Sequence, residues 1–336
     1  MIKGQEEEEL DIEDIDKEDM AKCFKEFPLQ IRDAFKVSTS LSKSIDSIFI
    51  VGMGGSAFGG DLLRAYLSKL SIPIYSVRDY SLPEFVTRNS LVFVVSYSGN
   101  TEETINAYRM AIRKDAQIIT MSAGGKLEKL ASRQDTLHIN IPFRDIQPRM
   151  SYCFQFFAML KVLENSGILK DLKPEVEKTI MNMNKPMFKE MAQELAQKLE
   201  GKVPIIYSSN TLKPLAYKWK INFNENTKIH AFCNVFPEMN HNEMLGYTDL
   251  KAGYYVIILK DEDDYHRIKK RMDITKKLIQ QRGVNVTEIG LKGHTLLTRM
   301  FTALYVGDWT SYYLAIKHKT DPTPVDLVEE FKGLMG

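Results

Sequence analysis

The stretch Leu91-Val92-Phe93-Val94-Val95-Ser96-Tyr97-Ser98-Gly99-Asn100-Thr101 joins two kinds of local structure. Its first five residues form an uninterrupted apolar run, which is typical of a fully buried β-strand. Beyond Thr101, the apolar residues Ile105, Tyr108 and Ile112 recur at helical spacing. The polar residues 96–101 are therefore expected on a turn that leads from a strand into a helix.

This turn has the composition of an anion-binding site. A helix N-terminus presents free N–H groups and a partial positive charge, and both suit a phosphate. The hydroxyls within 96–101 add donors, and Gly99 lets the backbone approach a ligand closely. Asn100, with Glu103 three residues later, is typical of a helix start. The alternative interpretation is an ordinary capped helix that binds no ligand.

The composition argues against several classes of protein. The 336 residues suffice for two domains, and 44% of them are hydrophobic, so a complete core is available. A formal net charge of +1 gives no support for nucleic acid or an anionic membrane as a partner. The chain has no long uncharged apolar run and no signal peptide, so we expect a soluble, cytoplasmic protein.

Metal and disulfide chemistry are not expected either. Cys23, Cys153 and Cys233 lie far apart and lack the spacing of a metal site or a redox motif, which predicts reduced, structural cysteines. The six histidines form no HxxxH or HExxH pattern, so we expect no zinc site.

Short apolar runs alternate with helical patterns through the first half of the chain. Strands are predicted at 47–51, 72–77, 91–95, 117–121 and 136–141. This rhythm predicts a parallel sheet covered by helices on both faces. Ligands of such sheets lie beyond the carboxyl ends of the strands. Both the 96–101 turn and a glycine-rich segment, Gly52–Gly60, are expected at that edge.

The same rhythm returns in the second half, with strands predicted at 203–207, 229–236, 254–259 and 284–289. We therefore predict an α/β protein with two parallel units. The expected divisions are an N-terminal helical segment (1–45) that packs on a first domain (46–150), a helical bridge (151–200) and a second domain (201–336). The acidic run Gln5–Glu9 is expected to be frayed.

The glycine-rich segment admits a rival interpretation. Gly52, Gly54 and Ala57 satisfy the fingerprint of a dinucleotide-binding turn, and Asp79 follows the second strand, where an acid that binds ribose belongs. Asp79 nevertheless comes later than the usual spacing of about 20 residues, and it follows Arg78. A second hydroxyl-rich loop at the same edge favours a small pocket for one phosphate and a polar body. An NAD-linked dehydrogenase, or tight packing alone, stays as an alternative.

Together these motifs resemble a known family. Gly54-Gly55-Ser56 and residues 96–101 are similar to the loops of the sugar isomerase (SIS) domain. Four further motifs and Lys332 resemble, in order, the bifunctional phosphoglucose/phosphomannose isomerase family, which belongs to the phosphoglucose isomerase superfamily. These motifs are Pro148-Arg149, Phe223-Asn224-Glu225-Asn226, Pro237–Glu243 and Asp321-Pro322-Thr323. The resemblance covers nearly the whole chain after the acidic start.

The resemblance implies a fold and an activity. The fold would be two SIS-type domains, each a parallel β-sheet flanked by helices on both faces, in a homodimer with active sites at the subunit interface. The activity would interconvert glucose 6-phosphate and mannose 6-phosphate with fructose 6-phosphate, by ring opening and a cis-enediolate proton transfer. No metal and no other cofactor would be needed.

The resemblance also implies roles for individual residues. Ser96, Ser98 and Thr101 would be phosphate ligands, and Gly55 and Ser56 would lie beside the sugar.

Four further residues would carry the chemistry. Glu225 would be the base, Arg149 the cationic stabiliser, and His241 and Lys332 the ring-opening pair, with the histidine supplied by the partner subunit. These residue types suit the reaction. A carboxylate within hydrogen-bond reach can move a proton between C1 and C2. A held guanidinium stabilises the enediolate as charge grows. An imidazole exchanges protons near neutral pH.

Several of these roles leave alternatives open. Glu238 is the second candidate for the base, and Glu238 or Glu243 could orient His241. Thr323 is a candidate for the small residue that gives the enediol room to turn about C2–C3, which would admit both C2 epimers. Lys332 lies near the end of the chain, where most lysines are solvated.

A different class of function also stays open. SIS domains occur in regulators that bind a sugar phosphate without converting it, and Glu225, Arg149 and His241 would then be incidental. The dehydrogenase hypothesis, in contrast, predicts NAD binding.

Overall fold

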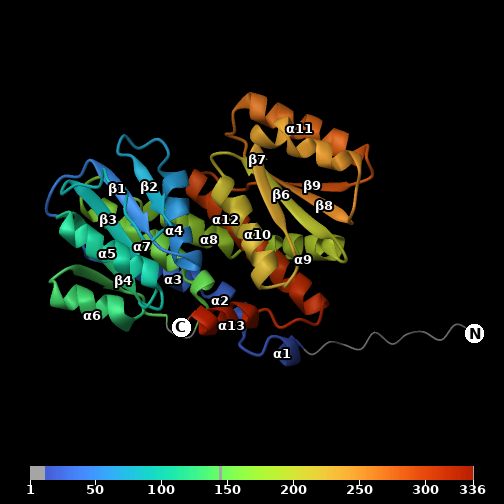
Figure 1. Ribbon diagram of the computed structural model, residues 1–336. Helices are drawn as coiled ribbons and strands as arrows, with labels where there is room; N and C mark the ends of the chain where they lie inside the picture. Colours follow the sequence, from blue (N-terminus) through green and yellow to red (C-terminus); the bar gives the residue numbers. More distant parts are fainter. Residues whose placement is uncertain (1–11, 144–145, 336) are drawn as a thin grey trace, which may run out of the picture.

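The computed structural model describes residues 12–143 and 146–335, which form two parallel β-sheets joined by helices (Figure 1). The acidic run Gln5–Glu9 lies outside these residues. The first sheet has the order β2-β1-β3-β4-β5, and every pairing in it is parallel. Its strands are β1 (Ser47–Val51), β2 (Ile74–Val77), β3 (Ser90–Val95), β4 (Gln117–Ser122) and β5 (Leu137–Asn140).

The second sheet has the order β7-β6-β8-β9, again with every pairing parallel. Its strands are β6 (Val203–Ser209), β7 (Phe232–Phe236), β8 (Tyr254–Lys260) and β9 (Asn285–Gly290). The prediction of two parallel α/β units is therefore confirmed. The strand predicted at 229–236 begins only at Phe232. Asn224 donates to the carbonyl of Ile229, so Ile229 belongs to the turn that follows the helix Lys213–Glu225.

The helices of the first half begin with three short ones and continue through the sheet connections. They are α1 (Ile12–Ile15), α2 (Met20–Lys25), α3 (Phe27–Ala34), α4 (Gly54–Tyr66), α5 (Glu102–Arg113), α6 (Gly125–Arg133) and α7 (Tyr152–Asn165), with the 3₁₀ turn η1 (Pro148–Met150) before α7. The apolar positions Met20, Phe24, Phe27 and Ile31, expected on one or two helices, lie on α2 and α3 and are buried.

The second half is richer in long helices. They are α8 (Lys173–Met183), α9 (Met187–Leu199), α10 (Lys213–Glu225), α11 (His266–Gln280), α12 (Leu296–Lys317) and α13 (Asp326–Met335). Two 3₁₀ turns, η2 (Glu238–His241) and η3 (Glu243–Thr248), follow β7. No helix within 12–143 or 146–335 combines the length and the apolar composition that a membrane span requires.

The two sheets share one layer of helices between them (Figure 1). A single apolar core joins inward-facing strand residues such as Ile50 and Ile257 with α4, α7, α9, α10 and α12. Two smaller cores lie on the outer faces, one under α5 and α6 and one under α11. This layering explains why β1 and β3 are buried along their whole length, as their uninterrupted apolar sequences predict.

The strand order changes direction between β1 and β3, which is where open parallel sheets bind ligands. The segments that follow these two strands are the glycine-rich segment and residues 96–101. Both therefore lie at the carboxyl edge of the first sheet, on either side of the switch point, as the sequence predicts.

Two local predictions are wrong in detail. The helix expected from Asp61 begins at Gly54, so most of the glycine-rich segment is the first two turns of α4 rather than a loop. Asn100 does not cap α5, because Thr101 occupies the N-cap position and the Asn100 side-chain oxygen accepts instead from the backbone N–H of Lys126.

Candidate active site

The loop between β3 and α5 is built to leave the start of the helix open. The side chain of Thr101, the N-cap residue of α5, makes no capping hydrogen bond, so the first N–H groups of this helix remain available to an anion. Ser96 and Thr101 lie at the two ends of the loop, and their hydroxyls are 2.9 Å apart. Ser98 is exposed, and its hydroxyl accepts from the N–H of Asn100 at 3.2 Å. The three predicted phosphate ligands therefore lie on one loop around one helix tip.

Gly99 is required by the shape of this loop. Its φ is +68°, and a β-carbon there would lie 1.9 Å from the carbonyl oxygen of Gly124. No other amino acid can meet both conditions, because the left-handed backbone is strained for other residues and the space is filled by the β4–α6 connection.

Ser56 joins the glycine-rich segment to residues 96–101, which we call the phosphate loop after its predicted ligand. Its side chain is 7% exposed, and its hydroxyl accepts from the N–H of Tyr97 at 2.9 Å. The hydroxyl keeps its own hydrogen for donation. Ser56 therefore lies against the residues that follow β3, while its predicted place beside the sugar stays a prediction.

Gly55 makes room for the backbone of Arg149. A β-carbon at Gly55 would lie 2.7 Å from both the Cα and the N atom of Arg149. This glycine therefore serves close packing of α4 against η1, one of the alternatives that the sequence left open. The packing also brings Arg149 to the edge of the sheet where the phosphate loop lies.

The guanidinium of Arg149 is buried and held from several sides. The residue is 4% exposed, and its Nε donates to Oδ1 of Asn226 at 2.9 Å. One terminal nitrogen donates to the backbone carbonyls of Pro322 and Thr323, at 2.9 and 3.0 Å. Burial lowers the pKa of Arg149, while the nearby carboxylate of Glu225 acts in the opposite direction. These contacts hold the positively charged guanidinium in one orientation.

Glu225 lies against this charge. Its Oε2 is 3.5 Å from the other terminal nitrogen of Arg149, and its side chain is 37% exposed. It is the last residue of α10, while Asn226 holds Arg149 and also donates to the hydroxyl of Ser311. The carboxylate therefore has a buried cation on one side and open space on the other.

A buried polar network lies behind Arg149. Lys218 is 2% exposed, and its Nζ lies 3.4 Å from the carbonyl of Arg149 and 3.6 Å from Oδ1 of Asp308. Asp308 is fully buried and accepts from Tyr152 and Asn222, both at 2.7 Å. Burial lowers the pKa of Lys218 and raises that of Asp308, and the attraction between the two opposes both shifts.

This network was missed by sequence reasoning, although a signal was present. Asp308 is the sole acidic residue in the long apolar helix 296–317, and such a residue needs a buried partner. Lys218 gave no comparable signal, because the sequence of α10 contains two other lysines at Lys213 and Lys220.

His241 lies apart from Glu225 within the chain. It is exposed and ends η2, which follows the carboxyl end of β7. Glu225 ends α10, which runs antiparallel to the strands and leads to the start of β7. The five residues of β7 separate these ends by about 17 Å.

The two glutamates near His241 bond elsewhere. Glu238 accepts from Asn242 at 2.7 Å, and Glu243 accepts from Tyr207 and Asn234. The prediction that one of them orients His241 therefore finds no support in these contacts.

The remaining two predicted residues differ in their surroundings. Thr323 is 4% exposed and lies at the site, since its carbonyl binds Arg149, and its hydroxyl has no partner among the described residues. Lys332 lies on the exposed helix α13, where it pairs with Glu329 at 2.6 Å.

Models of two protein families match this chain. The SIS domain matches residues 40–163, and the C-terminal SIS domain of bacterial phospho-glucose isomerase matches residues 188–335. Each match contains one of the two sheets.

Curated proteins and solved structures are also similar. A bifunctional phosphoglucose/phosphomannose isomerase of Caldicellulosiruptor bescii is 38% identical, over 91% of this chain and 96% of the relative. A D-glucosamine-6-phosphate 4-epimerase of Sulfolobus acidocaldarius is 31% identical, over 66% of this chain and 70% of the relative.

Among solved structures, the C-terminal domain of glucosamine-fructose-6-phosphate aminotransferase from Francisella tularensis superposes with a TM-score of 0.73 at 15% identity, covering 91% of this chain and 98% of that one. That likeness shows the fold of two SIS domains. Because the similarity to the C. bescii protein extends over almost all of both chains, this chain belongs to the bifunctional phosphoglucose/phosphomannose isomerase family.

Proposed function

We propose that this protein interconverts glucose 6-phosphate and mannose 6-phosphate with fructose 6-phosphate. The observation that carries the proposal is the contact between Glu225 and the buried guanidinium of Arg149, joined through Gly55 and Ser56 to the phosphate loop. A base, a held cation and a phosphate site are the parts that an enediolate mechanism requires.

The phosphate loop anchors the substrate in this proposal. Ser96, Ser98 and Thr101 donate hydroxyl hydrogens to the phosphate, and the open N–H groups of α5 add further donors. Anchoring the phosphate positions C1 and C2 of the opened sugar near Glu225, which converts proton transfer into an intramolecular step.

Glu225 then takes the proton from one carbon and returns it to the other. Arg149 stabilises the oxygen that becomes negatively charged between these steps, and its three hydrogen bonds keep it in place without reorganisation. Thr323 contributes its buried hydroxyl, which has no partner among the described residues, at the position proposed to leave the enediol room to turn.

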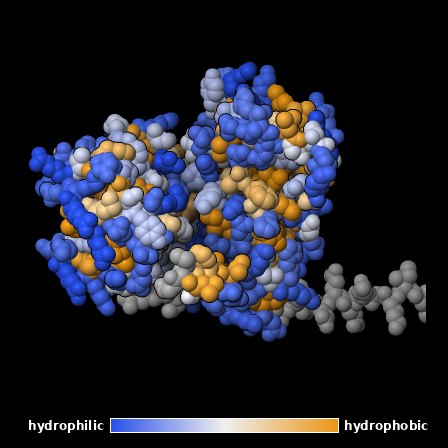
Figure 2. Space-filling view, in the orientation of Figure 1, coloured by the Kyte–Doolittle hydropathy of each residue, from blue (hydrophilic) through white to orange (hydrophobic). Residues whose placement is uncertain are grey.

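We also propose a homodimer, with His241 of one subunit completing the site of the other. Two observations support it. His241 lies at the opposite end of β7 from Glu225, so a single chain does not bring them together. In addition, α13 exposes an apolar face (Figure 2), and such a face favours a protein partner. The exposed apolar residues of α13 are Leu327, Val328, Phe331 and Leu334.

Lys332 lies on the same helix as this apolar face. In the proposed dimer it exchanges its exposed partner Glu329 for the ring oxygen of the sugar and works with His241 in ring opening. The three cysteines are free, which is consistent with the reducing conditions of the cytoplasm, where we propose that the enzyme works.

Incubation with fructose 6-phosphate tests the proposed activity. We expect both glucose 6-phosphate and mannose 6-phosphate to appear, without added metal or NAD. Binding of the sugar phosphate without any product would instead identify a regulator.

One relative is a glucosamine-6-phosphate 4-epimerase, so that amino sugar should be supplied in parallel. Conversion of glucosamine 6-phosphate with no isomerisation of fructose 6-phosphate would contradict the proposed function.

A further inference from the structure

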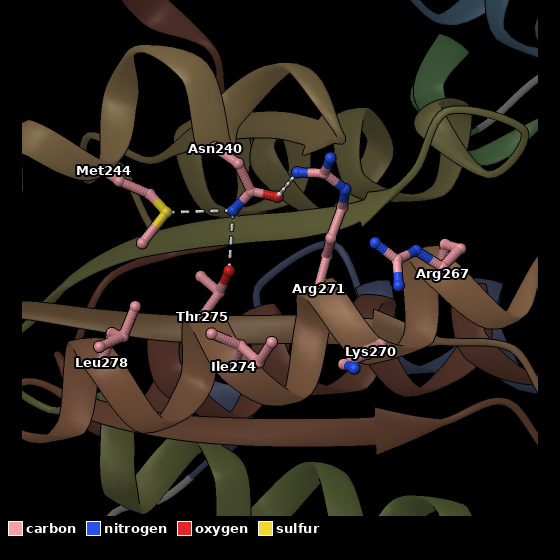
Figure 3. A pocket seen from close by; sticks show the side chains of 8 residues that line it. All are labelled: Asn240, Met244, Arg267, Lys270, Arg271, Ile274, Thr275 and Leu278. Atoms are coloured by element: carbon pink, nitrogen blue, oxygen red, sulfur yellow. Dashed lines mark hydrogen bonds between the residues drawn. The ribbon is translucent and has the colours of Figure 1, made fainter.

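A cavity lies on the outer side of the second sheet. It has a volume of about 340 Å³ and opens between α11 and the loop formed by η2 and η3 (Figure 3). α11 packs on the outer core of this sheet, whereas α10 belongs to the central core. The sheet therefore separates this cavity from Arg149 and Glu225.

One end of the cavity is strongly cationic. Arg267, Lys270 and Arg271 contribute to its lining, and none of the described lining residues is acidic. Arg267 and Lys270 have no ion pair and no hydrogen bond to a described residue, and Arg271 makes one side-chain bond, to Asn240. Positive charges three and four residues apart on one helix repel each other. An anion at this end would therefore stabilise the helix.

The other end of the cavity is apolar. Met244, Ile274 and Leu278 lie there, on the side away from the guanidinium groups of Arg267 and Arg271 (Figure 3). Ile274 is 49% exposed, so it offers apolar surface that a ligand could cover. The cavity thus has a cationic end and an apolar end.

We propose that this cavity binds a phosphate ester with a short apolar body. The phosphate would lie among Arg267, Lys270 and Arg271, since its charge of about −1.5 to −2 near neutral pH balances most of theirs. The carbon body would lie against Met244, Ile274 and Leu278. A volume of about 340 Å³ is at the lower end of the range for small-molecule sites.

The cavity is connected to the loop that carries His241. Asn240 directly precedes His241, and its side-chain oxygen accepts from Arg271 at 3.4 Å while its nitrogen donates to Thr275 at 2.8 Å. A phosphate forms shorter, charge-assisted bonds with a guanidinium and would draw Arg271 away from Asn240. The ligand should therefore loosen the loop and lower turnover without changing substrate affinity. This regulatory step rests on the proposed function, whereas the binding itself does not.

Methyl NMR of methionine-labelled protein tests the binding. Phenyl phosphate is the probe, and the Met244 signal, assigned by its loss in Met244→Leu, reports on the cavity locally. We expect a saturable shift with phenyl phosphate and a weaker one with inorganic phosphate. The double variant R267Q/K270Q should weaken binding at least about tenfold, since it removes two of three charges. Lys277→Gln should bind like wild type, because Lys277 is exposed on the same helix but does not line the cavity.

The binding proposal is overturned if Met244 does not respond at about 10 mM phenyl phosphate, or if R267Q/K270Q and Lys277→Gln respond alike. An unchanged kcat during saturation of the Met244 shift would overturn the regulatory step. A protein that shifts at Met244 but isomerises no sugar would disprove the proposed function alone, so the two failures are distinguishable.

Discussion

Oε2 of Glu225 lies 3.5 Å from a terminal nitrogen of Arg149, and the other nitrogens of that guanidinium bind Asn226, Pro322 and Thr323. Because these bonds hold the guanidinium in place, Arg149 does not move with the side chain of Glu225. As Glu225 takes up a proton, its attraction for Arg149 falls and the positive charge becomes available to the enediolate.

Replacing Glu225 with Gln should lower kcat by about 10²–10⁴-fold, because a general base contributes that much, and should leave KM nearly unchanged. Steady-state kinetics with fructose 6-phosphate measures both. Glu238→Gln is the matched control, since Glu238 is the rival base and lies on η2. Loss of turnover in Glu238→Gln with retention in Glu225→Gln would reverse the assignment.

Mixing two inactive variants should restore activity if sites are shared between subunits. A dimer of one Glu225→Gln chain and one His241→Ala chain holds one site with both defects and one intact site. After random exchange of subunits, about a quarter of all sites should be active. Product formation before and after mixing measures this, and no recovery in a mixture shown to contain mixed dimers would assign His241 to its own chain.

Gly99→Ala should raise KM for the sugar phosphate by at least about tenfold, which corresponds to about 1.4 kcal/mol of binding free energy. Its β-carbon would collide with the carbonyl of Gly124 and displace the phosphate loop. Gly201 also has a positive φ, +65°, but nothing lies within 4 Å of its β-carbon position. Gly201→Ala should therefore cost about 1 kcal/mol of stability through backbone strain and leave KM unchanged. Equal KM values for the two variants would contradict the role of this loop.

Lys218→Met should lower the free energy of unfolding by about 3–5 kcal/mol, because it leaves the buried carboxylate of Asp308 without its cation. The exposed pair of Lys251 and Asp249 gives the comparison, and Lys251→Met should cost about 0–1 kcal/mol. Urea unfolding at neutral pH measures both. A small effect at Lys218 would show that Tyr152 and Asn222 alone satisfy Asp308.

Stability should fall in mild acid partly because of His138. Burial lowers the pKa of His138 below its ordinary value of 6.5, although Glu128 acts in the opposite direction. Between the lowered and the ordinary pKa the unfolded chain binds more protons, so the free energy of unfolding decreases as the pH falls from about 6.5 through the folded-state pKa. His138→Gln should remove this part of the pH dependence. Urea unfolding of both proteins at about pH 5, 6, 7 and 8 measures it, and identical slopes would contradict the assignment.

The sheets and the edge that carries the site were predictable because their signals are local. Residues 91–101 contain a buried strand and an open helix start in eleven consecutive positions, and the structure places them as expected. The resemblance to the isomerase family supplied Arg149 and Glu225, which the fold brings into contact across 76 positions, from 149 to 225.

Other features depend on contacts that no local pattern encodes. Gly52–Gly60 was predicted as a glycine-rich loop that approaches a ligand, yet Gly55 and Gly60 allow the close approach of Arg149 and Ile50 that packs α4 into the core. Asn100 carries a good capping side chain, but its oxygen accepts from the N–H of Lys126 in the first turn of α6. The pair of Lys218 and Asp308 comes from two helices far apart in the chain.

The carbonyls that hold Arg149 come from positions 322 and 323, which are 173 and 174 residues further along the chain. A ribosome must therefore have made the chain through position 323 before the guanidinium acquires its orientation, even though both sheets are already encoded upstream. A nascent chain that stops before Pro322 and Thr323 would contain the sequences of both sheets and of the phosphate loop. Its Arg149 guanidinium would lack the two carbonyls that orient it.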